Sequence, residues 1–377
     1  MEVIRDQLIH CHFISLYGKM EEMLIMKRDY ILFCLVIFII FHLNGCSQET
    51  YLTERGNREA REGNYDSAIN IYDKVLKINP NNADIYYNRG LAWAYKRDLE
   101  NAISDYTKAL EIKKDFKDAY HNRGLLFSKM GKYNLAILDF TKALQLNPDN
   151  SQKLNIIFNR AYAWSEMNHF EKAIEGYTEA LKIHEMSKVN PSDLPEVYYY
   201  RGESWYGKGN LDNAISDYTK AIQKKPDYDK AIFRRADRLS ENKDYASAII
   251  DYEKAIGLNP ENTLAHNNYS WLLSTCPNGR FRNGEKALKL ALKANELITN
   301  EVIYLDTLAA AYAEKGNFEK AIQIEEKAVS LLRNDKRDLN KLKDDFKKRL
   351  KSFKAEKPWR DNGEKKDWMR SYKPMGS

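Results

Sequence analysis

Cysteine is scarce in this sequence, and its placement argues against a fold held together by disulfide bonds. The 377 residues include four cysteines, Cys11, Cys34, Cys46 and Cys276, of which the first three lie near the N-terminus. If the N-terminal segment is removed and Cys46 is modified, as argued below, Cys276 is the only free thiol left. Exported proteins that depend on disulfides usually carry their cysteines in pairs. We therefore expect packing alone to stabilise this protein.

A hydrophobic run long enough to cross a membrane is also lacking. The most apolar stretch covers 14 positions, 30–43, whereas a membrane-spanning helix needs about 20 residues and a signal-peptide core about 7–15. Lys27 and Arg28 precede the stretch and supply a short positive charge. The pattern predicts a secretory signal peptide at 26–45. Translation is expected to begin at Met26, which would make residues 1–25 an over-extension of the reading frame.

The signal peptide ends in Leu43-Asn44-Gly45-Cys46, which resembles the lipobox of bacterial lipoproteins. The resemblance implies cleavage before Cys46, attachment of fatty acids such as palmitate to Cys46, and a lipid-anchored linker at 46–48. Ser47 follows the cysteine, and in a Gram-negative envelope this favours the periplasmic face of the outer membrane. The alternative is a short uncleaved anchor with an incidental cysteine, which would also place the following residues outside the cytoplasm.

The rest of the chain is rich in charge and poor in proline, and it repeats. With 30% charged residues, 43% hydrophobic residues and nine prolines, the composition is typical of a soluble helical protein. Three glycines, Gly56, Gly90 and Gly124, are spaced 34 residues apart. A row of alanines and a row of aromatic residues recur with them. These rows are Ala68, Ala102, Ala136, Ala173, Ala214, Ala248, Ala287 and Ala321, and Tyr72, Tyr106, Phe140, Tyr177, Tyr218 and Tyr252.

One unit, residues 86–112, shows how such a repeat can fold. Gly90 lies in a first helix, a turn follows at 96–98, and Ala102, Tyr106 and Ala109 form an apolar stripe on a second helix. The small residues let two antiparallel helices approach, and the units must stack to bury their apolar faces. This pattern resembles the tetratricopeptide repeat. The resemblance implies an all-α, right-handed superhelical solenoid of about eight helix-turn-helix units over 49–334.

The C-terminal 43 residues differ in charge from the repeats. Residues 335–377 hold 15 Lys and Arg against 8 Asp and Glu. Apolar residues at helical spacing predict a capping helix within 335–357 that covers the last repeat. Residues 358–377 are expected to form a basic, flexible tail, either simply solvated or touching anionic lipid or acidic glycan.

No catalytic motif stands out. The sequence has no Gly-rich phosphate loop, no paired-cysteine or HExxH metal spacing and no nucleophile elbow. The chain is therefore not expected to be an enzyme, to hold a cofactor or metal, or to bind a small-molecule substrate. Nucleic acid is not expected as a partner either, because the basic excess is confined to the C-terminal segment and the aromatic residues are spaced as core.

Recognition of proteins or peptides remains. In tetratricopeptide proteins the first helix of each unit lines a concave groove, and Asn88, Asn122 and Asn159 would form a row there like the asparagine ladder of some members. An amide can both donate to and accept from a peptide backbone. The alternative is that these amides bond to one another or to water. The predicted peptide-groove residues are Tyr87, Asn88, Leu91, His121, Asn122, Leu125, Phe158, Asn159, Tyr162, Tyr199 and Tyr200.

A second row of polar residues falls where the family usually has leucine. Arginine occupies this position in six consecutive units, at Arg55, Arg89, Arg123, Arg160, Arg201 and Arg235. Unpaired guanidinium groups at an interhelical seam would be costly. Acidic partners precede the aromatic residue in four second helices, at Asp105, Asp139, Asp217 and Asp251, which predicts a structural Arg–Asp ladder. Spacing does not tell whether the pairs form within a unit or between neighbours.

These features together predict a lipid-anchored scaffold or adaptor that binds protein or peptide partners at the bacterial cell envelope. The alternative function is a non-catalytic accessory module of an envelope machine that handles glycan or polysaccharide, with the basic tail contacting the polymer.

Overall fold

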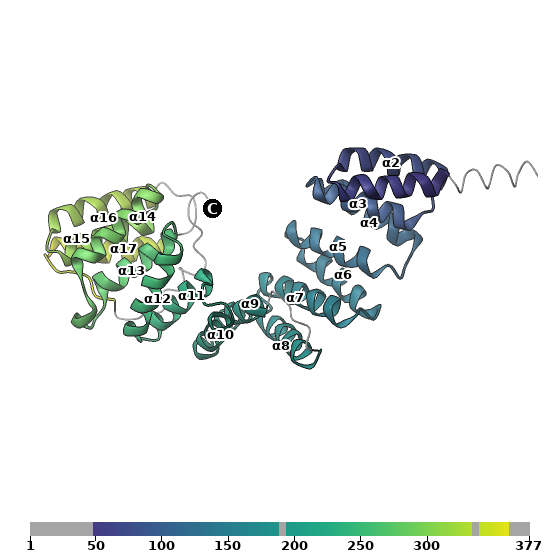
Figure 1. Cartoon of the computed structure of the whole chain (residues 1–377). Helices are drawn as coiled ribbons and strands as arrows, with labels where there is room; N and C mark the ends of the chain where they lie inside the picture. The colour runs from purple at the N-terminus through teal and green to yellow at the C-terminus, as the bar shows by residue number, and fades with distance from the viewer. Residues whose placement is uncertain (1–47, 188–193, 334–338, 362–377) are drawn as a thin grey trace, which may run out of the picture. The chain divides into compact units, whose positions relative to one another are not determined.

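The structure, a computed structural model, describes residues 48–187, 194–333 and 339–361 (Figure 1). Within these ranges the regular elements are all helices, and no strand occurs, which confirms the all-α prediction. None of the described helices is both long and apolar enough to span a membrane. The predicted signal peptide and Cys46 lie outside the described residues.

The chain divides into two compact units between Pro148 and Asp149. The first unit contains three helical hairpins stacked in chain order (Figure 1). The first hairpin pairs the helix that ends at residue 61 with α2 (Tyr65–Ile78). The next two pair α3 (Ala83–Tyr95) with α4 (Leu99–Ile112), and α5 (Lys117–Lys129) with α6 (Tyr133–Gln145).

The second unit contains five hairpins and a final helix. They are α7 (Asn150–Glu166) with α8 (Phe170–Ser187), α9 (Leu194–Gly207) with α10 (Leu211–Lys224), α11 (Asp229–Glu241) with α12 (Tyr245–Leu258), α13 (Thr263–Thr275) with α14 (Gly284–Leu297), and α15 (Val302–Glu314) with α16 (Phe318–Arg333). The short 3-10 helix η1 (Gly279–Phe281) lies in the longer turn of the fourth of these, and α17 (Asn340–Lys354) follows the last. The eight described hairpins agree with the predicted solenoid of about eight repeats.

The turns inside the hairpins follow from local sequence. In the turn between α3 and α4, Arg97 takes a left-handed conformation with φ of 65°, and the Asp98 carboxylate accepts a hydrogen bond from the Asn101 N–H. The left-handed residue ends one helix, and the acidic cap begins the next. Gly131 and Gly209 take the same backbone position in later hairpins, where φ is 71° and 85°.

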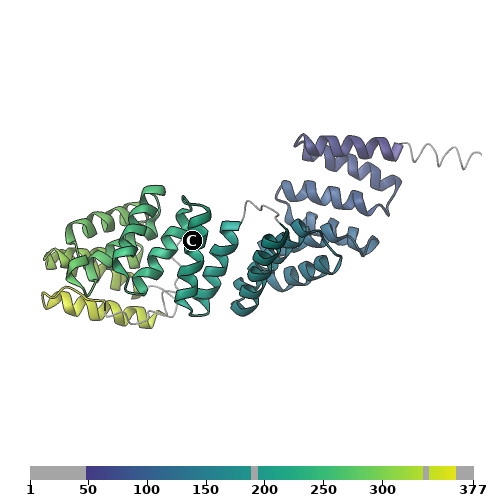
Figure 2. The same cartoon turned by 60° about the horizontal axis from the view of Figure 1, so that its bottom comes forward.

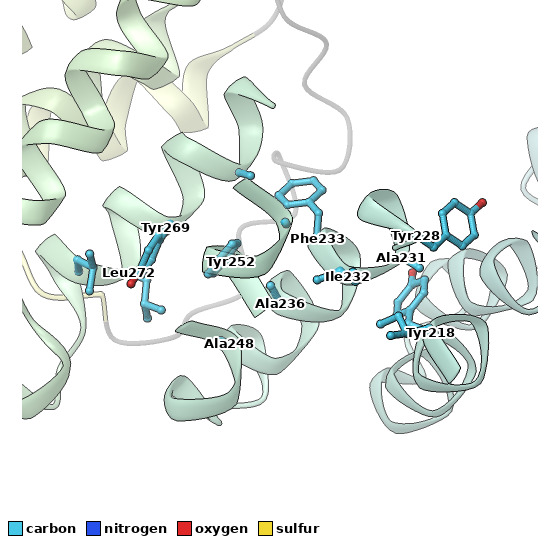
Figure 3. Packing of buried hydrophobic residues seen from close by; sticks show 14 of the residues in the cluster. Tyr218, Tyr228, Ala231, Ile232, Phe233, Ala236, Ala248, Tyr252, Tyr269 and Leu272 are labelled. Carbon is cyan, nitrogen blue, oxygen red and sulfur yellow. The ribbon is translucent and has the colours of Figure 1, made fainter. Parts of the chain in front are cut away.

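Small and aromatic residues meet in each hairpin as the repeat pattern predicts. A Cβ placed on Gly90 would lie 2.8 Å from Cε1 of Tyr106, so the helices of this hairpin approach as closely as a glycine allows. Ala102 and Ala109 are fully buried beside this contact. In the second unit the same type of core runs through α10, α11, α12 and α13, where Figure 3 shows Tyr218, Tyr252 and Tyr269 among buried alanines.

The last helix, α17, lies within the predicted capping segment and packs against α16 (Figure 2). Leu342 and Phe346 on α17 are buried against Val302, Ala328 and Leu332, so the helix covers the apolar end of the eighth hairpin. The prediction of a flexible tail from residue 358 is wrong for residues 359–361. These three residues return to α13 and make specific contacts there, whereas 362–377 lie outside the described residues.

Candidate functional site

Each predicted Arg–Asp pair of the ladder forms inside a single hairpin. The arginine of the first helix contacts the aspartate 16 residues later on the second helix, through Nε to Oδ2 and Nη2 to Oδ1. These distances lie between 2.6 and 2.8 Å in all four pairs. The aspartates are nearly buried, and the arginines are 13–22% exposed. The pairs are Arg89–Asp105, Arg123–Asp139, Arg201–Asp217 and Arg235–Asp251.

The third nitrogen of each guanidinium bonds to the preceding hairpin. Nη1 of Arg123 donates to Thr107 Oγ1 at 3.0 Å, and Nη1 of Arg235 donates to Thr219 Oγ1 at 3.2 Å. Arg201 reaches Thr178 in the same way, and Arg89 contacts Asp73. In all four cases the acceptor lies on the second helix of the preceding hairpin, and it directly follows the aromatic residue of that helix's repeat position. Each arginine therefore joins two consecutive hairpins, an arrangement that a search for acidic partners alone could not find.

The two arginines without an acidic partner at the expected place behave differently. The position 16 residues after the arginine, where the other hairpins have aspartate, is Ile71 for Arg55 and Gly176 for Arg160. Arg55 is exposed. Among the described residues Arg160 makes no ion pair, and burial lowers its pKa although the Glu179 charge opposes this. Gly176 is required by packing, because a Cβ there would lie 2.8 Å from Cβ of Ala161.

A second polar network runs along the opposite side of the first helices. We call this side the first-helix face. It is defined relative to the small residue of each first helix, which is Gly90 in α3. The face consists of the residues three and two positions before the small residue and the residue one position after it, which in α3 are Tyr87, Asn88 and Leu91. The residue one after the small residue is an acceptor in several hairpins. Asn57 accepts from the Tyr72 hydroxyl at 2.9 Å and from Nδ2 of Asn88 in the next hairpin at 3.2 Å.

Asp237 repeats this arrangement in the second unit. Its carboxylate accepts from the Tyr252 hydroxyl at 2.7 Å and from Nδ2 of Asn268 at 2.9 Å. Glu203 contacts the Tyr218 hydroxyl and lies 3.4 Å from Nε of Arg234. Sequence reasoning missed these acceptors, although their fixed place beside the small residue could have identified them.

In the first unit the first-helix face combines aromatic, amide and aliphatic side chains that remain partly exposed. Nδ2 of Asn122 donates to the Tyr87 hydroxyl at 2.9 Å, and burial raises the pKa of Tyr87 to about 12. The phenol therefore stays protonated at neutral pH and can also donate to a bound group. Leu91 and Leu125 lie between these polar groups on successive hairpins, half-buried. Burial lowers the pKa of His121, which favours the neutral imidazole there.

The predicted groove residues are divided between the two compact units. Asn88 and Asn122 lie in the first unit, and Asn159 lies on α7 in the second, so each unit presents its own part of the row. At Asn88 and Asn122, one amide N–H bonds to a neighbouring hairpin, to Asn57 and to the Tyr87 hydroxyl respectively. The amide oxygen and the second N–H of each residue are not part of these two bonds.

Further along, Phe158, Tyr162 and Tyr200 form an aromatic cluster on the first-helix face of α7 and α9. The Tyr200 ring lies 5.7 Å from Phe158 and 5.4 Å from Tyr162, both edge to face. Tyr199 does not belong to an accessible groove. It is buried against Tyr218 on α10 and against Tyr228, which directly precedes α11.

No group of three metal-binding side chains occurs in the parts of the chain that the structure covers. What the described geometry offers is a set of hydrogen-bonding and aromatic side chains on rigid helices. Such a surface can bind a peptide through its backbone and anchor large side chains.

Comparison with known protein families gives several matches along the chain. A model described as "TPR repeat" matches residues 56–94. Models described as "Tetratricopeptide repeat" match residues 83–116 and 118–150, 195–228, and 229–262. These segments coincide with hairpins of both units.

Among curated proteins, a DnaJ homolog subfamily C member 7 homolog from Dictyostelium discoideum is 34% identical over 97 residues. The match covers 26% of this chain and only 17% of that protein. Among solved structures, the C-terminal part of a TPR repeat-containing protein from Cytophaga hutchinsonii is 17% identical, with a TM-score of 0.53, over 68% of this chain and 99% of that one. YrrB, described as a TPR protein with an unusual peptide-binding site, is 22% identical, with a TM-score of 0.44, over 52% of this chain and 95% of its own.

Proposed function

Because this chain is a tetratricopeptide-repeat protein, we propose that it acts as an adaptor that binds a peptide segment of a partner protein on the first-helix face of its repeats. The observation that carries the proposal is the surface of α3 and α5. Leu91 and Leu125 lie there at equivalent places in consecutive hairpins, beside the Asn122–Tyr87 hydrogen bond. The helices that hold these side chains are fixed by the Arg–Asp pairs on their other side.

The chemistry of this surface favours a segment with mixed apolar and amide or carbonyl groups. The half-buried leucines offer apolar contacts, and the neighbouring phenol and amides offer donors and acceptors for a peptide main chain. Since these groups are hydrogen-bonded to each other, they are held in place before a ligand arrives. Preorganisation of this kind lowers the entropic cost of binding.

A site-specific crosslinking experiment tests the adaptor proposal. A photo-crosslinking amino acid replaces Leu125 on the first-helix face, or Glu111, an exposed residue of a second helix, in cells that express the full chain. We expect discrete protein adducts from position 125 and none from position 111. Changing Asn88, Asn122 and Asn159 together to Ala should lower the adduct yield without loss of helical signal. Equal adducts from both positions would contradict the proposal.

We further propose that the protein works at a bacterial membrane, attached through lipid on Cys46. This rests on the sequence motif at 43–46. The described helical array begins by residue 48, only two residues after Cys46, so a chain anchored there would present its first repeat within about 10 Å of the lipid, at ~3.4 Å per residue.

A further inference from the structure

The residues of the first-helix face are much more buried in the last hairpin than in the first unit. In α5, Ala119 and Gly124 are the buried residues of 13. In α15, ten of 13 residues are buried, among them Asp306, Thr307 and Ala310, which occupy the first-helix face around Ala309. Both sides of α15 are therefore inaccessible, although only one side is needed for packing against α16.

Part of this cover is the non-helical segment that follows α17. Residues 359–361 lie against α13 and α15, and the residues of α13 that they contact are about 90 positions away in the sequence. The Asp361 N–H donates to the Thr275 carbonyl at 2.9 Å, and the Asp361 carboxylate accepts from Nε1 of Trp271 at 2.8 Å. Trp271 takes the place on α13 that Leu91 and Leu125 take on α3 and α5, one residue after the small Ser270.

Arg360, the residue before Asp361, contacts a different set of groups. Nη1 of Arg360 lies 2.7 Å from a carboxylate oxygen of Glu314 at the end of α15. It also donates to the Ser274 carbonyl at 3.2 Å, near the end of α13, where helix carbonyls lack internal partners. Glu314 is only 13% exposed, and its other oxygen accepts from Nε of Arg282 at 2.9 Å. The groups that receive Arg360 thus come from two separate helices, α13 and α15.

Trp359 supplies the apolar contact. It packs, with Trp271, on the cluster formed by Ala309, Ala310, Ala313 and Phe353. The alanines of α15 leave room for a large ring, whereas the first-helix face of α3 carries Leu91 at the place of Ala310. Three consecutive residues, aromatic, cationic and anionic, therefore each meet a matching receiver, and a main-chain hydrogen bond sets their register.

These contacts have the character of peptide recognition: the main chain supplies one bond and consecutive side chains supply specificity. We propose that the first-helix face of α13 and α15 is a peptide-binding site for a Trp-Arg-Asp sequence, closed in cis by Trp359, Arg360 and Asp361. A partner peptide with the same order of aromatic, guanidinium and carboxylate groups binds to the site by displacing this segment. The site is separate from the surface of α3 and α5, so the two proposals stand or fall independently.

The test measures binding of a fluorescent synthetic peptide with the sequence of residues 355–363, AEKPWRDNG, to the full chain. The double variant Trp359→Ala, Arg360→Ala should bind this peptide at least ~10-fold more tightly than the unchanged chain. The reason is that a tethered competitor acts at an effective concentration of about millimolar, well above the dissociation constant expected for a short peptide of modest affinity. A peptide with Ala in place of its Trp and Arg should bind neither protein.

Three further variants link binding to the described contacts. Adding Trp271→Phe to the double variant keeps the ring but removes the donor to the peptide carboxylate, and should weaken binding roughly 2–10-fold. The exposed pair Lys351→Ala, Lys357→Ala leaves the cis segment in place and should bind like the unchanged chain. Arg360→Gln alone keeps Trp359 in its cluster, so its fold is protected, and it should give an intermediate gain.

The proposal is overturned if neither the double variant nor Arg360→Gln binds the peptide better than the unchanged chain, because residues 358–361 would then be a fixed part of the fold. It is also overturned if the unchanged chain is a dimer that the double substitution dissociates, since the segment would then dock on a second copy.

Discussion

Arg123 and Asp139 face each other across one hairpin through two hydrogen bonds of 2.8 Å each, from Nε to Oδ2 and from Nη2 to Oδ1. The remaining Nη1 donates to Thr107 of the preceding hairpin. A planar guanidinium matches a carboxylate in this two-point geometry, and lysine cannot reproduce it. The same residue thus fixes the geometry inside a repeat and the contact between repeats.

The first prediction concerns this pair. Arg123→Ala leaves the nearly buried Asp139 without its partner and should lower the free energy of unfolding by about 2–4 kcal/mol, somewhat less than for a fully buried pair because Arg123 is 17% exposed. Lys129→Ala on the same helix, an exposed residue, should change it by less than ~0.5 kcal/mol. Urea unfolding followed by circular dichroism measures both. Equal midpoints for the two variants would show that the pair contributes nothing.

The second prediction concerns the network on the first-helix face. Asp237→Ala removes the acceptor of the Tyr252 hydroxyl and of the Asn268 amide at a site where the Asp237 side chain is 8% exposed. We expect a loss of about 2–3 kcal/mol, because Tyr252 is buried and its hydroxyl is left unsatisfied.

Glu241→Ala is the matched control for Asp237→Ala. Glu241 contacts the neighbouring Arg238 at 3.3 Å from a side chain that is 34% exposed, so its loss should cost no more than ~1 kcal/mol. A control variant that loses as much stability as Asp237→Ala would contradict the importance assigned to the network.

The third prediction is a pH dependence at the end of the array. Burial raises the pKa of Glu325 on α16 well above its ordinary value of 4.5, the Asp306 carboxylate from α15 adds to this, and the Arg349 charge from α17 opposes it. The native state keeps a proton that the unfolded state has lost. Stability should therefore fall as the pH rises from about 4.5 through the pKa of the folded state.

Glu325→Gln imitates the protonated acid and should flatten this part of the pH profile, with the largest gain in unfolding midpoint over the unchanged chain at the highest pH. Glu326→Gln is the control, because Glu326 is half exposed and pairs with Lys354 at 2.7 Å. Urea midpoints at pH 5 and pH 8 decide the matter. A profile for Glu325→Gln that runs parallel to that of the unchanged chain would refute the assignment.

The fourth prediction tests the lipid anchor. In a bacterial host, the full chain should incorporate a fatty-acid analogue and partition into the detergent phase, and Cys46→Ser should abolish both. Cys276→Ser should have no effect, because this thiol is buried in the folded array. A Cys46→Ser protein that still carries label would mean that another residue is acylated. One that still partitions into detergent without label would mean that an uncleaved apolar segment makes the attachment.

Much of the fold was determined by local sequence. The 34-residue spacing of Gly56, Gly90 and Gly124 predicts hairpins because a small residue, an alanine and an aromatic must meet at every repeat. The Arg–Asp pairs were predictable in kind for the same reason: an arginine at a helix seam needs an acid, and the acid recurs at a constant interval. These periodic patterns involve residues that are close together in the sequence, so they can be recognised without the tertiary structure.

Tertiary structure decided the remainder. The choice of Thr107 as the third partner of Arg123 depends on how neighbouring hairpins stack, and the burial of Tyr199 depends on its contacts with Tyr218 and Tyr228 in the next part of the array. The return of residues 359–361 to α13 depends on contacts with Trp271, 90 positions away in the sequence, and with Glu314 on α15. Composition predicted a basic, flexible tail there, because it averages charge along the chain. Only the folded array brings a carboxylate, a tryptophan and free helix carbonyls to one place where a single Trp-Arg-Asp segment can satisfy them.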